Sequence, residues 1–279
     1  MADSPGLGAF LRAHRAALDP TELGLPAGVT RRRVDGLRRE ELAQLAGISV
    51  DYYTRLEQDR GRNVSASVLD ALARALRLTP DERAYLHNLA APPRRRQSPP
   101  RRRKVRAELL TLLESMHDVP AFVFGRGLDV LAWNRLGGKL AHDMDAVPPG
   151  ERNMARLFFL DDGARELYPD WKRLTAEVAA NLRAEAGRYP DDPDIVALVG
   201  ELSMRSDAFR RLWVRQSVKE KTHGEKRIVN PIVGELTVHY ETFRLPDDSD
   251  QMLATYTAEP GSASENALRM LASWIADDA

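Results

Sequence analysis

A segment rich in proline and arginine constrains this chain more than any other feature of the sequence. The segment APPRRRQSPPRRRK, residues 91–104, contains four prolines and seven basic residues and almost no apolar side chain. Such a composition cannot form a hydrophobic core, and its proline density favours an extended, semi-rigid conformation. The sequence therefore predicts two domains, residues 1–91 and residues 105–279, joined by a linker over residues 92–104.

Charge is divided unevenly between these two parts. Residues 1–104 hold 20 Lys and Arg against 12 Asp and Glu, a net charge of +8. Residues 105–279 hold 21 Lys and Arg against 29 Asp and Glu, a net charge of −8, so the whole chain is neutral. We expect the basic part to bind a polyanion and the acidic part to have a different partner. The linker is expected to be solvated, and its arginines can also contact phosphates.

Several classes of function are excluded by what the sequence lacks. It contains no cysteine, so disulfides, thiolate metal sites and cysteine nucleophiles are absent. Its six histidines never occur in a metal-ligand spacing such as HExxH, and no dinucleotide or nucleophile-elbow motif is present. No apolar run reaches the ~18 residues that span a bilayer, and the N-terminus lacks the pattern of a secretory signal. We expect a cytoplasmic protein that is not an enzyme and holds no metal or cofactor.

The first domain is predicted to be entirely helical. Apolar residues at helical spacing indicate five helices, over residues 7–18, 38–46, 49–58, 65–76 and 79–89. In the second of them, Leu42 and Leu45 are expected to point inward. Thr79 and Glu82 form a capping-box pattern at the start of the last helix. The segment 19–36, rich in proline and glycine, is predicted to be a long loop.

Residues 38–57 follow the pattern of a helix-turn-helix motif. Ala43 is small where the two helices must approach closely, and Gly47 supplies a left-handed turn residue. Ile48 is the apolar residue of the turn. Tyr53 and Leu56, three residues apart, share one face of the second helix and should point into the core. The pattern predicts an all-α helix-turn-helix domain.

The second domain is predicted to be α+β. Strand-like segments occur at residues 121–125, 129–134, 226–231, 235–245 and 251–258. Helical segments are predicted at residues 105–116, 135–142, 152–160, 171–187, 194–204, 206–216 and 264–276. This order indicates one antiparallel sheet with helices packed on one face, which matches a PAS-like sensor domain.

Longer stretches resemble two known families. Residues 7–90 resemble the Cro/C1-type (XRE-like) helix-turn-helix regulators through LGAFLRAHRAAL, GLRREELAQLAGISVDYYTRLEQDR and VLDALARALRLTPDERAYLHNLA. Residues 105–279 resemble the MmyB-like regulator ligand-binding domain through PAFVFGRGLDVLAWNRL, YPDWKRL, YPDDPDIVALVGELSMRSDAFRRLW, VGELTVHYETFRLPDD and YTAEPGS. The resemblance implies a bacterial transcription regulator, nucleoid-associated when bound to DNA. It also implies a C-terminal domain that can hold a fatty acid or similar apolar ligand.

The resemblance also implies which residues contact DNA. Val50, Asp51 and Arg55 occupy base-contacting positions, where Arg55 suits guanine, Asp51 suits cytosine and Val50 suits a thymine methyl group. For Asp51, pairing with Arg55 four residues later is an alternative to a base contact. The other predicted DNA-binding residues are the N-cap Ser49 and the candidate phosphate contacts Arg31, Arg32, Arg33, Arg39, Tyr52 and Arg60.

A ligand in the second domain would lie between the sheet and the inserted helices. The predicted lining residues are Phe122, Phe124, Trp133, Asn134, Phe158, Phe159, Trp171, Trp213, His223 and Tyr240. An acyl carboxylate would need a polar anchor, for which the candidates are Asn134, Arg135, Arg215, His223 and His239. In the family pattern a histidine is frequent just after the helix that contains Trp213, where this chain has Gln216.

Two hypotheses follow for the whole chain. In the first, a homodimer binds a pseudo-palindromic operator in double-stranded DNA, and a small apolar ligand changes the arrangement of its two DNA-binding domains. In the alternative, the C-terminal domain is a dimerisation or protein-interaction module with a filled core and no ligand. A flavin or haem sensor is a further alternative, but the sequence has neither a cysteine for a covalent adduct nor a clear haem ligand.

Overall fold

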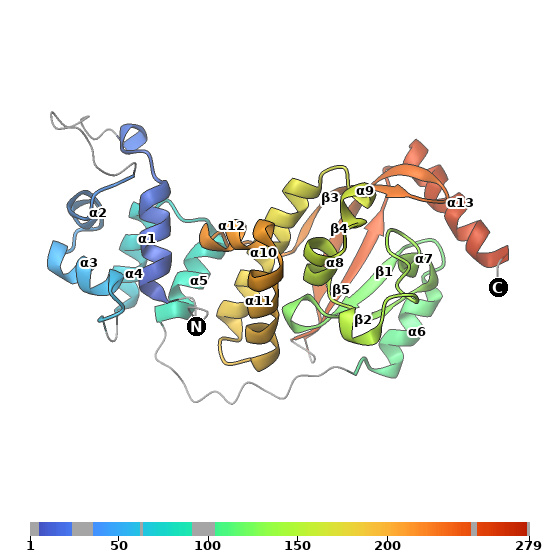
Figure 1. Ribbon diagram of the computed structural model, residues 1–279, viewed down its shortest axis with the longest axis horizontal. Helices are drawn as coiled ribbons and strands as arrows, with labels where there is room; N and C mark the ends of the chain where they lie inside the picture. Colours follow the sequence, from blue (N-terminus) through green and yellow to red (C-terminus); the bar gives the residue numbers. More distant parts are fainter. Residues whose placement is uncertain (1–5, 24–35, 62–63, 91–103, 247–249, 278–279) are drawn as a thin grey trace.

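The computed structural model describes residues 6–23, 36–61, 64–90, 104–246 and 250–277. Within these residues, one hydrophobic core lies among helices near the N-terminus and a second lies between a sheet and its covering helices. Figure 1 shows these two parts side by side along the long axis of the molecule. The predicted linker lies outside the described residues except for Lys104, so the domain boundaries stay a prediction.

The first part of the chain forms helices at the predicted places. Their bounds are α1 Leu7–Ala17, η1 Pro20–Leu23 (a short 3-10 helix), α2 Arg39–Ala46, α3 Val50–Glu57, α4 Ala66–Ala75 and α5 Pro80–Ala90. The Ser49 hydroxyl accepts a hydrogen bond from the Tyr52 N–H (3.2 Å) and caps α3. Thr79 and Glu82 form the expected capping box at the start of α5.

One expectation about the core of this helical part is wrong. Leu42 is fully buried as expected, but Leu45 is 42% exposed. Ala43 and Ala46 take the inward positions beside Leu42, because α2 packs against both α3 and α4 along this stripe.

A buried carboxylate, that of Glu57 at the end of α3, connects three helices. Arg15 of α1 donates from Nε to Oε1 (2.6 Å), Arg39 of α2 donates from Nε to Oε2 (2.7 Å), and the Tyr53 hydroxyl donates to Oε1 (2.7 Å). Burial alone would raise the pKa of this carboxyl group. The hydrogen bonds that it accepts outweigh burial and lower the pKa of Glu57 below its ordinary value.

The second part of the chain contains a five-stranded antiparallel sheet. The strands are β1 Ala121–Phe124, β2 Val130–Trp133, β3 His223–Asn230, β4 Gly234–Arg244 and β5 Met252–Thr257. Their order in the sheet is β2-β1-β5-β4-β3. The first strand of this part, β1, therefore pairs with its last strand, β5. The predicted α+β, PAS-like fold with an antiparallel sheet is confirmed.

Helices cover both faces of this sheet, so the expectation of helices on one face is wrong. Phe122 and Phe124 of β1 point into the main core, whereas Ala121 and Val123 are buried with Leu109 of α6 on the opposite face. All four residues of β1 are apolar, which requires cover on both sides.

The helices of this part are α6 Ala107–Ser115, α7 Arg135–Gly138, α8 Met154–Leu160, α9 Ala164–Leu167, α10 Trp171–Arg188, α11 Pro193–Arg205, α12 Asp207–Val214 and α13 Ala263–Asp277. Two short 3-10 helices are η2 Arg126–Leu128 and η3 Pro149–Glu151.

The two parts of the chain meet where α5 packs on α10. Ala184 of α10 and Val218, in the segment after α12, belong to the hydrophobic core of the helical part. Gly187 of α10 faces Tyr85 of α5 so closely that an added Cβ would overlap the tyrosine ring. These contacts place the end of α10 inside the core of the N-terminal helices.

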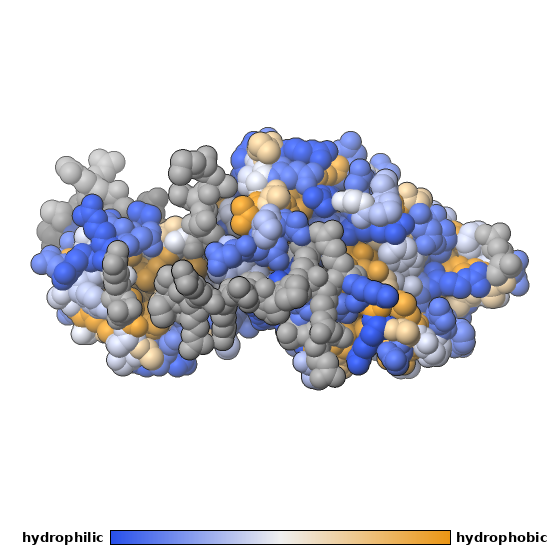
Figure 2. Space-filling view, turned by 90° about the horizontal axis from the view of Figure 1, so that it is seen from below, coloured by the Kyte–Doolittle hydropathy of each residue, from blue (hydrophilic) through white to orange (hydrophobic). Residues whose placement is uncertain are grey.

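The exposed apolar side chains of the described residues are mostly scattered over the surface. Charged and polar residues dominate the face seen in Figure 2, with smaller apolar areas on both parts of the chain. The large apolar residues that are exposed are spread over many elements: Leu45, Val50, Leu110, Leu112, Val196, Met204, Val214, Ile232, Phe243, Met270 and Trp274. Scattered residues of this kind are usual on protein surfaces, so an apolar ligand is expected in the interior.

Replacement Glu57→Gln tests the role of the buried carboxylate. We expect the free energy of unfolding of the helical part to fall by about 3–5 kcal/mol, because Arg15 then remains as a buried cation without its charged partner. Denaturant unfolding followed by circular dichroism measures this loss, with the exposed Glu40→Gln as the matched control. The stabilisation by Glu57 is complete above the ordinary carboxyl pKa and is lost as the pH falls through its lowered folded-state pKa. The two proteins should therefore converge in stability at low pH, and equal stability at neutral pH would contradict this role.

Candidate DNA-binding helix and ligand cavity

The turn between α2 and α3 fixes the direction in which α3 leaves α2. Gly47 has a φ of 66°, which is the left-handed conformation that glycine adopts without a steric penalty. The Ile48 N–H then donates to the Ala43 carbonyl (3.0 Å) and closes the end of α2. The three residues of the turn pattern thus have the roles expected of a helix-turn-helix motif.

One face of α3 is buried and the other is open. Tyr53 and Leu56 have no exposed surface, as the spacing predicted. Val50 is 37% exposed, and Asp51 and Arg55 are exposed on the same side of the helix. Such a helix, supported by a core and bearing short and long polar side chains outward, can enter the major groove of DNA.

Arg55 and Asp51 interact, but not through an ion pair. The Arg55 Nε donates weakly to the backbone carbonyl of Asp51 (3.4 Å). Within the described residues, the Asp51 carboxylate has no hydrogen-bond or ion-pair partner. The carboxylate is therefore available to accept a hydrogen bond from a base amino group.

The remaining predicted DNA-binding residues have more varied surroundings. Arg39 is half-exposed at the start of α2 and pairs with Glu57, while Ser49 uses its hydroxyl as the cap of α3. Tyr52 is half-buried and Arg60 is exposed beyond the end of α3. Three of them lie outside the described residues: Arg31, Arg32 and Arg33. Contact with DNA stays a prediction for the whole set.

Two small adjoining cavities lie beside the sheet, the first against α8 and α10 and the second against α8 and the segment that follows α7. Phe124, Met154 and Lys226 border both of them. Each has a volume of about 30 Å³, which is room for no more than a few water molecules. Ligand pockets usually measure about 300–1,000 Å³, so a lipid-sized ligand requires the helices to move away from the sheet.

Part of the predicted lining borders these cavities. Among the described residues, Phe122, Phe124, Phe158 and Tyr240 do so. Phe159 and Trp213 instead pack on Phe209, with ring centroids 5.2 and 5.1 Å apart. The predicted residues that do not border the cavities are Trp133, Asn134, Phe159, Trp171, Trp213 and His223. Ligand contact stays a prediction for every residue of the set.

The predicted polar anchors do not border the cavities either. The Asn134 side chain caps α7 through Gly137 N–H (2.8 Å) and donates to two backbone carbonyls, which uses its polar atoms in the fold. Arg135 donates to the carbonyl of Ile275 (3.1 Å). The other three candidates are exposed: Arg215, His223 and His239.

Two lysines that sequence reasoning missed do border the cavities. Lys226 is 7% exposed and shares the inward face of β3 with Ile228 and Asn230. Burial lowers the pKa of Lys226 to about 8, against the attraction of a nearby Glu177. Burial also lowers the pKa of Lys221 well below its ordinary value, and the charge of Lys226 lowers it further. Lys226 and Ile228 are two residues apart and therefore share one face of the strand, which was the one available signal in the sequence. A lysine in a strand, however, is usually expected to face solvent.

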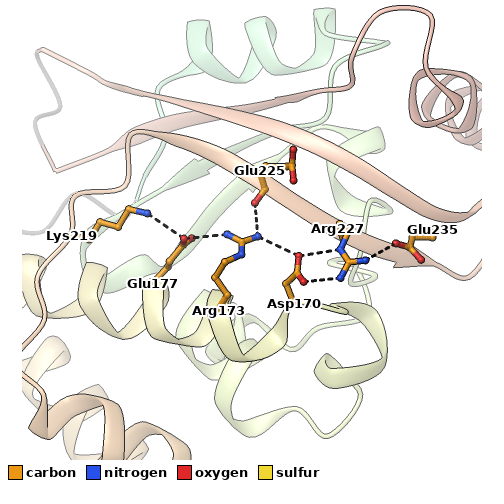
Figure 3. Close-up of polar contacts among 7 residues, drawn as sticks. All are labelled: Asp170, Arg173, Glu177, Lys219, Glu225, Arg227 and Glu235. Atoms are coloured by element: carbon orange, nitrogen blue, oxygen red, sulfur yellow. Dashed lines mark hydrogen bonds and ion pairs between the residues drawn. The ribbon is translucent and has the colours of Figure 1, made fainter.

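A chain of ion pairs joins α10 to β3 (Figure 3). It lies at the rim of the cavity that Glu177 and Lys221 border. Glu177 of α10 accepts hydrogen bonds from Arg173 and from Lys219, each at 3.2 Å. Asp170, just before α10, accepts from Arg227 of β3 at 2.7 Å. Glu177 is the only carboxylate among the described lining residues, and its charge is shared with two cations that do not line the cavity.

A larger cleft of about 300 Å³ opens on the surface between η2, α8 and α11. Its arginines already have partners: Arg156 pairs with Glu201 (2.8 Å), and Arg152 lies over the Trp133 ring (4.8 Å). The lining of the cleft is more polar than that of the two small aromatic cavities, so the cleft is a poorer site for an apolar ligand.

Neither a membrane-spanning helix nor a cluster of metal ligands occurs among the described residues. None of their helices combines the length and the apolar character that crossing a bilayer requires. The same residues contain no group of three or more His, Cys, Asp or Glu side chains placed to hold a metal ion.

Two family models match the chain. A model of the MmyB-like transcription regulator ligand binding domain matches residues 105–271, and a model of a helix-turn-helix domain matches residues 6–86. No curated protein matches the chain significantly. The two matches confirm the resemblance that was inferred from the sequence for both parts.

Replacement Arg55→Ala tests the assignment of α3 as the recognition helix. We expect a loss of about 1–3 kcal/mol in binding that is confined to one base position per half-site, because a bidentate contact to one base is removed. Binding measured against a library of single-base operator variants detects this change. Arg74→Ala on α4, another arginine in a last helical turn, is the control. Unchanged base selectivity in the Arg55 variant would show that α3 is wrongly assigned.

Proposed function

The chain belongs to the family of regulators with an MmyB-like transcription regulator ligand binding domain, and we propose that it is a sequence-specific DNA-binding regulator controlled by a small apolar ligand such as a fatty acid. The observation that carries this proposal is a shared helix. Glu177, Val178 and Asn181 of α10 border the cavity, and Ala184 of the same helix lies in the core of the DNA-binding part. A change at the cavity therefore acts on the element that holds the DNA-binding domain.

Recognition of DNA is assigned to α3 of each subunit in a homodimer. Two copies of α3 on a two-fold axis would read the two halves of a pseudo-palindromic operator in successive major grooves. Base choice would rest on Val50, Asp51 and Arg55. Phosphate contacts by the surrounding arginines would supply the salt-dependent part of the affinity.

Ligand control requires two arrangements of the protein that bind the ligand differently. The small volume of the cavities supports such a difference, because a lipid fits only after α8 and α10 move away from the sheet. The end of α10 would then shift relative to α5. In a dimer this shift changes the spacing or the orientation of the two α3 helices.

A second connection runs through the segment between α12 and β3. The Glu220 N–H donates to Asp81 at the start of α5 (2.8 Å), and Val218 is buried in the helical core. Gln216 of the same segment accepts from Arg183 of α10 (2.6 Å). The segment therefore contacts the DNA-binding part immediately before it reaches Lys221 at the cavity.

The alternative function is a dimerisation or protein-interaction module without a ligand. The observation in its favour is the same small volume of about 30 Å³ in each cavity, which is close to a filled core. Native mass spectrometry of the purified chain and thermal unfolding with fatty acids of ten to eighteen carbons distinguish the two functions. We expect retained lipid and a raised unfolding temperature. Absence of both retained lipid and a raised unfolding temperature would favour the module without a ligand.

Replacement Gly187→Ala tests the proposed coupling through α10. The added methyl group would overlap the buried Tyr85 ring, which must move, while alanine favours the helix, so the contact of α5 with α10 is disturbed although α10 persists. We expect the ratio of operator affinities with and without tetradecanoic acid to fall close to one. Fluorescence anisotropy with labelled operator measures this ratio.

Gly200→Ala in α11 is the matched control for this test. An added Cβ there meets no atom within 4 Å, so the variant should keep the wild-type ratio. If the Gly187 variant also kept the wild-type ratio, coupling through the contact of α5 with α10 would be refuted.

A further inference from the structure

Two lysine ammonium groups face one aromatic wall of the cavity. The Lys221 Nζ lies 4.1 Å from the ring centroid of Phe124 and 5.4 Å from that of Tyr240. The Lys226 Nζ lies 5.3 Å from the Tyr240 centroid and 5.6 Å from that of Phe158. Both cations are thus arranged around Tyr240, and cation–π attraction supplies part of the stabilisation that water would otherwise provide.

Neither ammonium group has a charged or hydrogen-bonding partner within the described residues. Lys226 is buried and Lys221 is partly buried. Cations in a protein interior normally have such a partner, because leaving a charge unpaired there is costly. Here burial lowers the pKa of both lysines, and the charge of Lys226 lowers the pKa of Lys221 further. An anion placed between Lys221 and Lys226 would remove both costs.

The carboxylate at the rim balances the two lysines only in part. Glu177 borders the cavity and its charge favours the protonated form of Lys226, but its Oε1 also accepts hydrogen bonds from Arg173 and Lys219 (Figure 3). The lining therefore keeps an excess of positive charge. An excess of this kind within aromatic walls is the pattern of a site for an anionic head group.

We propose that Lys221 and Lys226 bind the anionic head group of the ligand, so that the regulator recognises a long-chain carboxylate and rejects neutral chains of equal length. This inference rests on the proposed ligand control. Lys226 borders both cavities, and the second continues past it between Phe122 and Ile228. The carboxylate lies between the two lysines, and the acyl chain follows this apolar path once the helices have moved apart.

The experiment compares tetradecanoic acid with 1-tetradecanol on the full chain by isothermal titration calorimetry. We expect wild type to prefer the acid by about ten- to a hundredfold, because a hydrogen bond to a charged group is lost with the alcohol. The variants Lys221→Met and Lys226→Met should each lose a similar factor for the acid and keep their affinity for the alcohol. Lys226→Arg keeps the cation and should retain the preference for the acid.

Lys172→Met on α10 is the control, because it removes the same charge at an exposed residue that neither lines the cavity nor pairs with Glu177. Its preference for the acid should equal that of wild type. If wild type binds both compounds equally and the lysine variants change nothing, ligand control stands and the assignment of the two lysines is overturned. If wild type binds neither compound, the proposed ligand control fails and the assignment fails with it.

Discussion

The buried carboxylate of Glu57 is the interaction on which the DNA-binding part depends. An isolated charge in a protein interior is unfavourable, and Glu57 is tolerated only because three donors from three helices converge on it. Arg15 also donates to the carbonyl of Leu37 (2.6 Å), which fixes the chain just before α2. The orientation of α3 is thus set by directional hydrogen bonds as well as by packing. Arg39 is the only donor to Oε2 among the described residues, so its loss would leave that buried oxygen without a hydrogen bond.

From this network a continuous path of packed residues leads to the ligand-binding part. Phe10 of α1 packs on Tyr85 of α5, with ring centroids 5.3 Å apart, and Tyr85 in turn faces Gly187 of α10. Arg183, one turn earlier on α10, is fully buried, donates to the Trp213 carbonyl and lies over the indole ring at 3.8 Å. Because close-packed side chains transmit displacement rather than absorb it, a shift of α10 moves α5 and the helices attached to it.

Local signals in the sequence predicted most of the elements, and long-range pairing explains the failures. The caps at Ser49 and Thr79 and the turn at Gly47 depend on residues within one helical turn, so they could be found from the sequence. The exposure of Leu45 and the second covered face of β1 depend on which elements pack together, which a single sequence does not specify. Lys226 was missed for the same reason: strand alternation allows either face to be inward, and a charged residue is usually on the outward one.

The arrangement of the parts also limits how a ligand can act on DNA binding. The contact with the second part is made by α5, whereas α2 and α3 lie at the far end of the helical part, away from α10 (Figure 1). The acidic second part therefore does not cover the face that would meet DNA, and control by simple blocking of α3 has no basis in this geometry. Under the proposed function, α10 would change the position of one DNA-binding domain of a dimer relative to the other. Ligand binding would then change which spacing of operator half-sites the protein prefers, and this response requires a dimer.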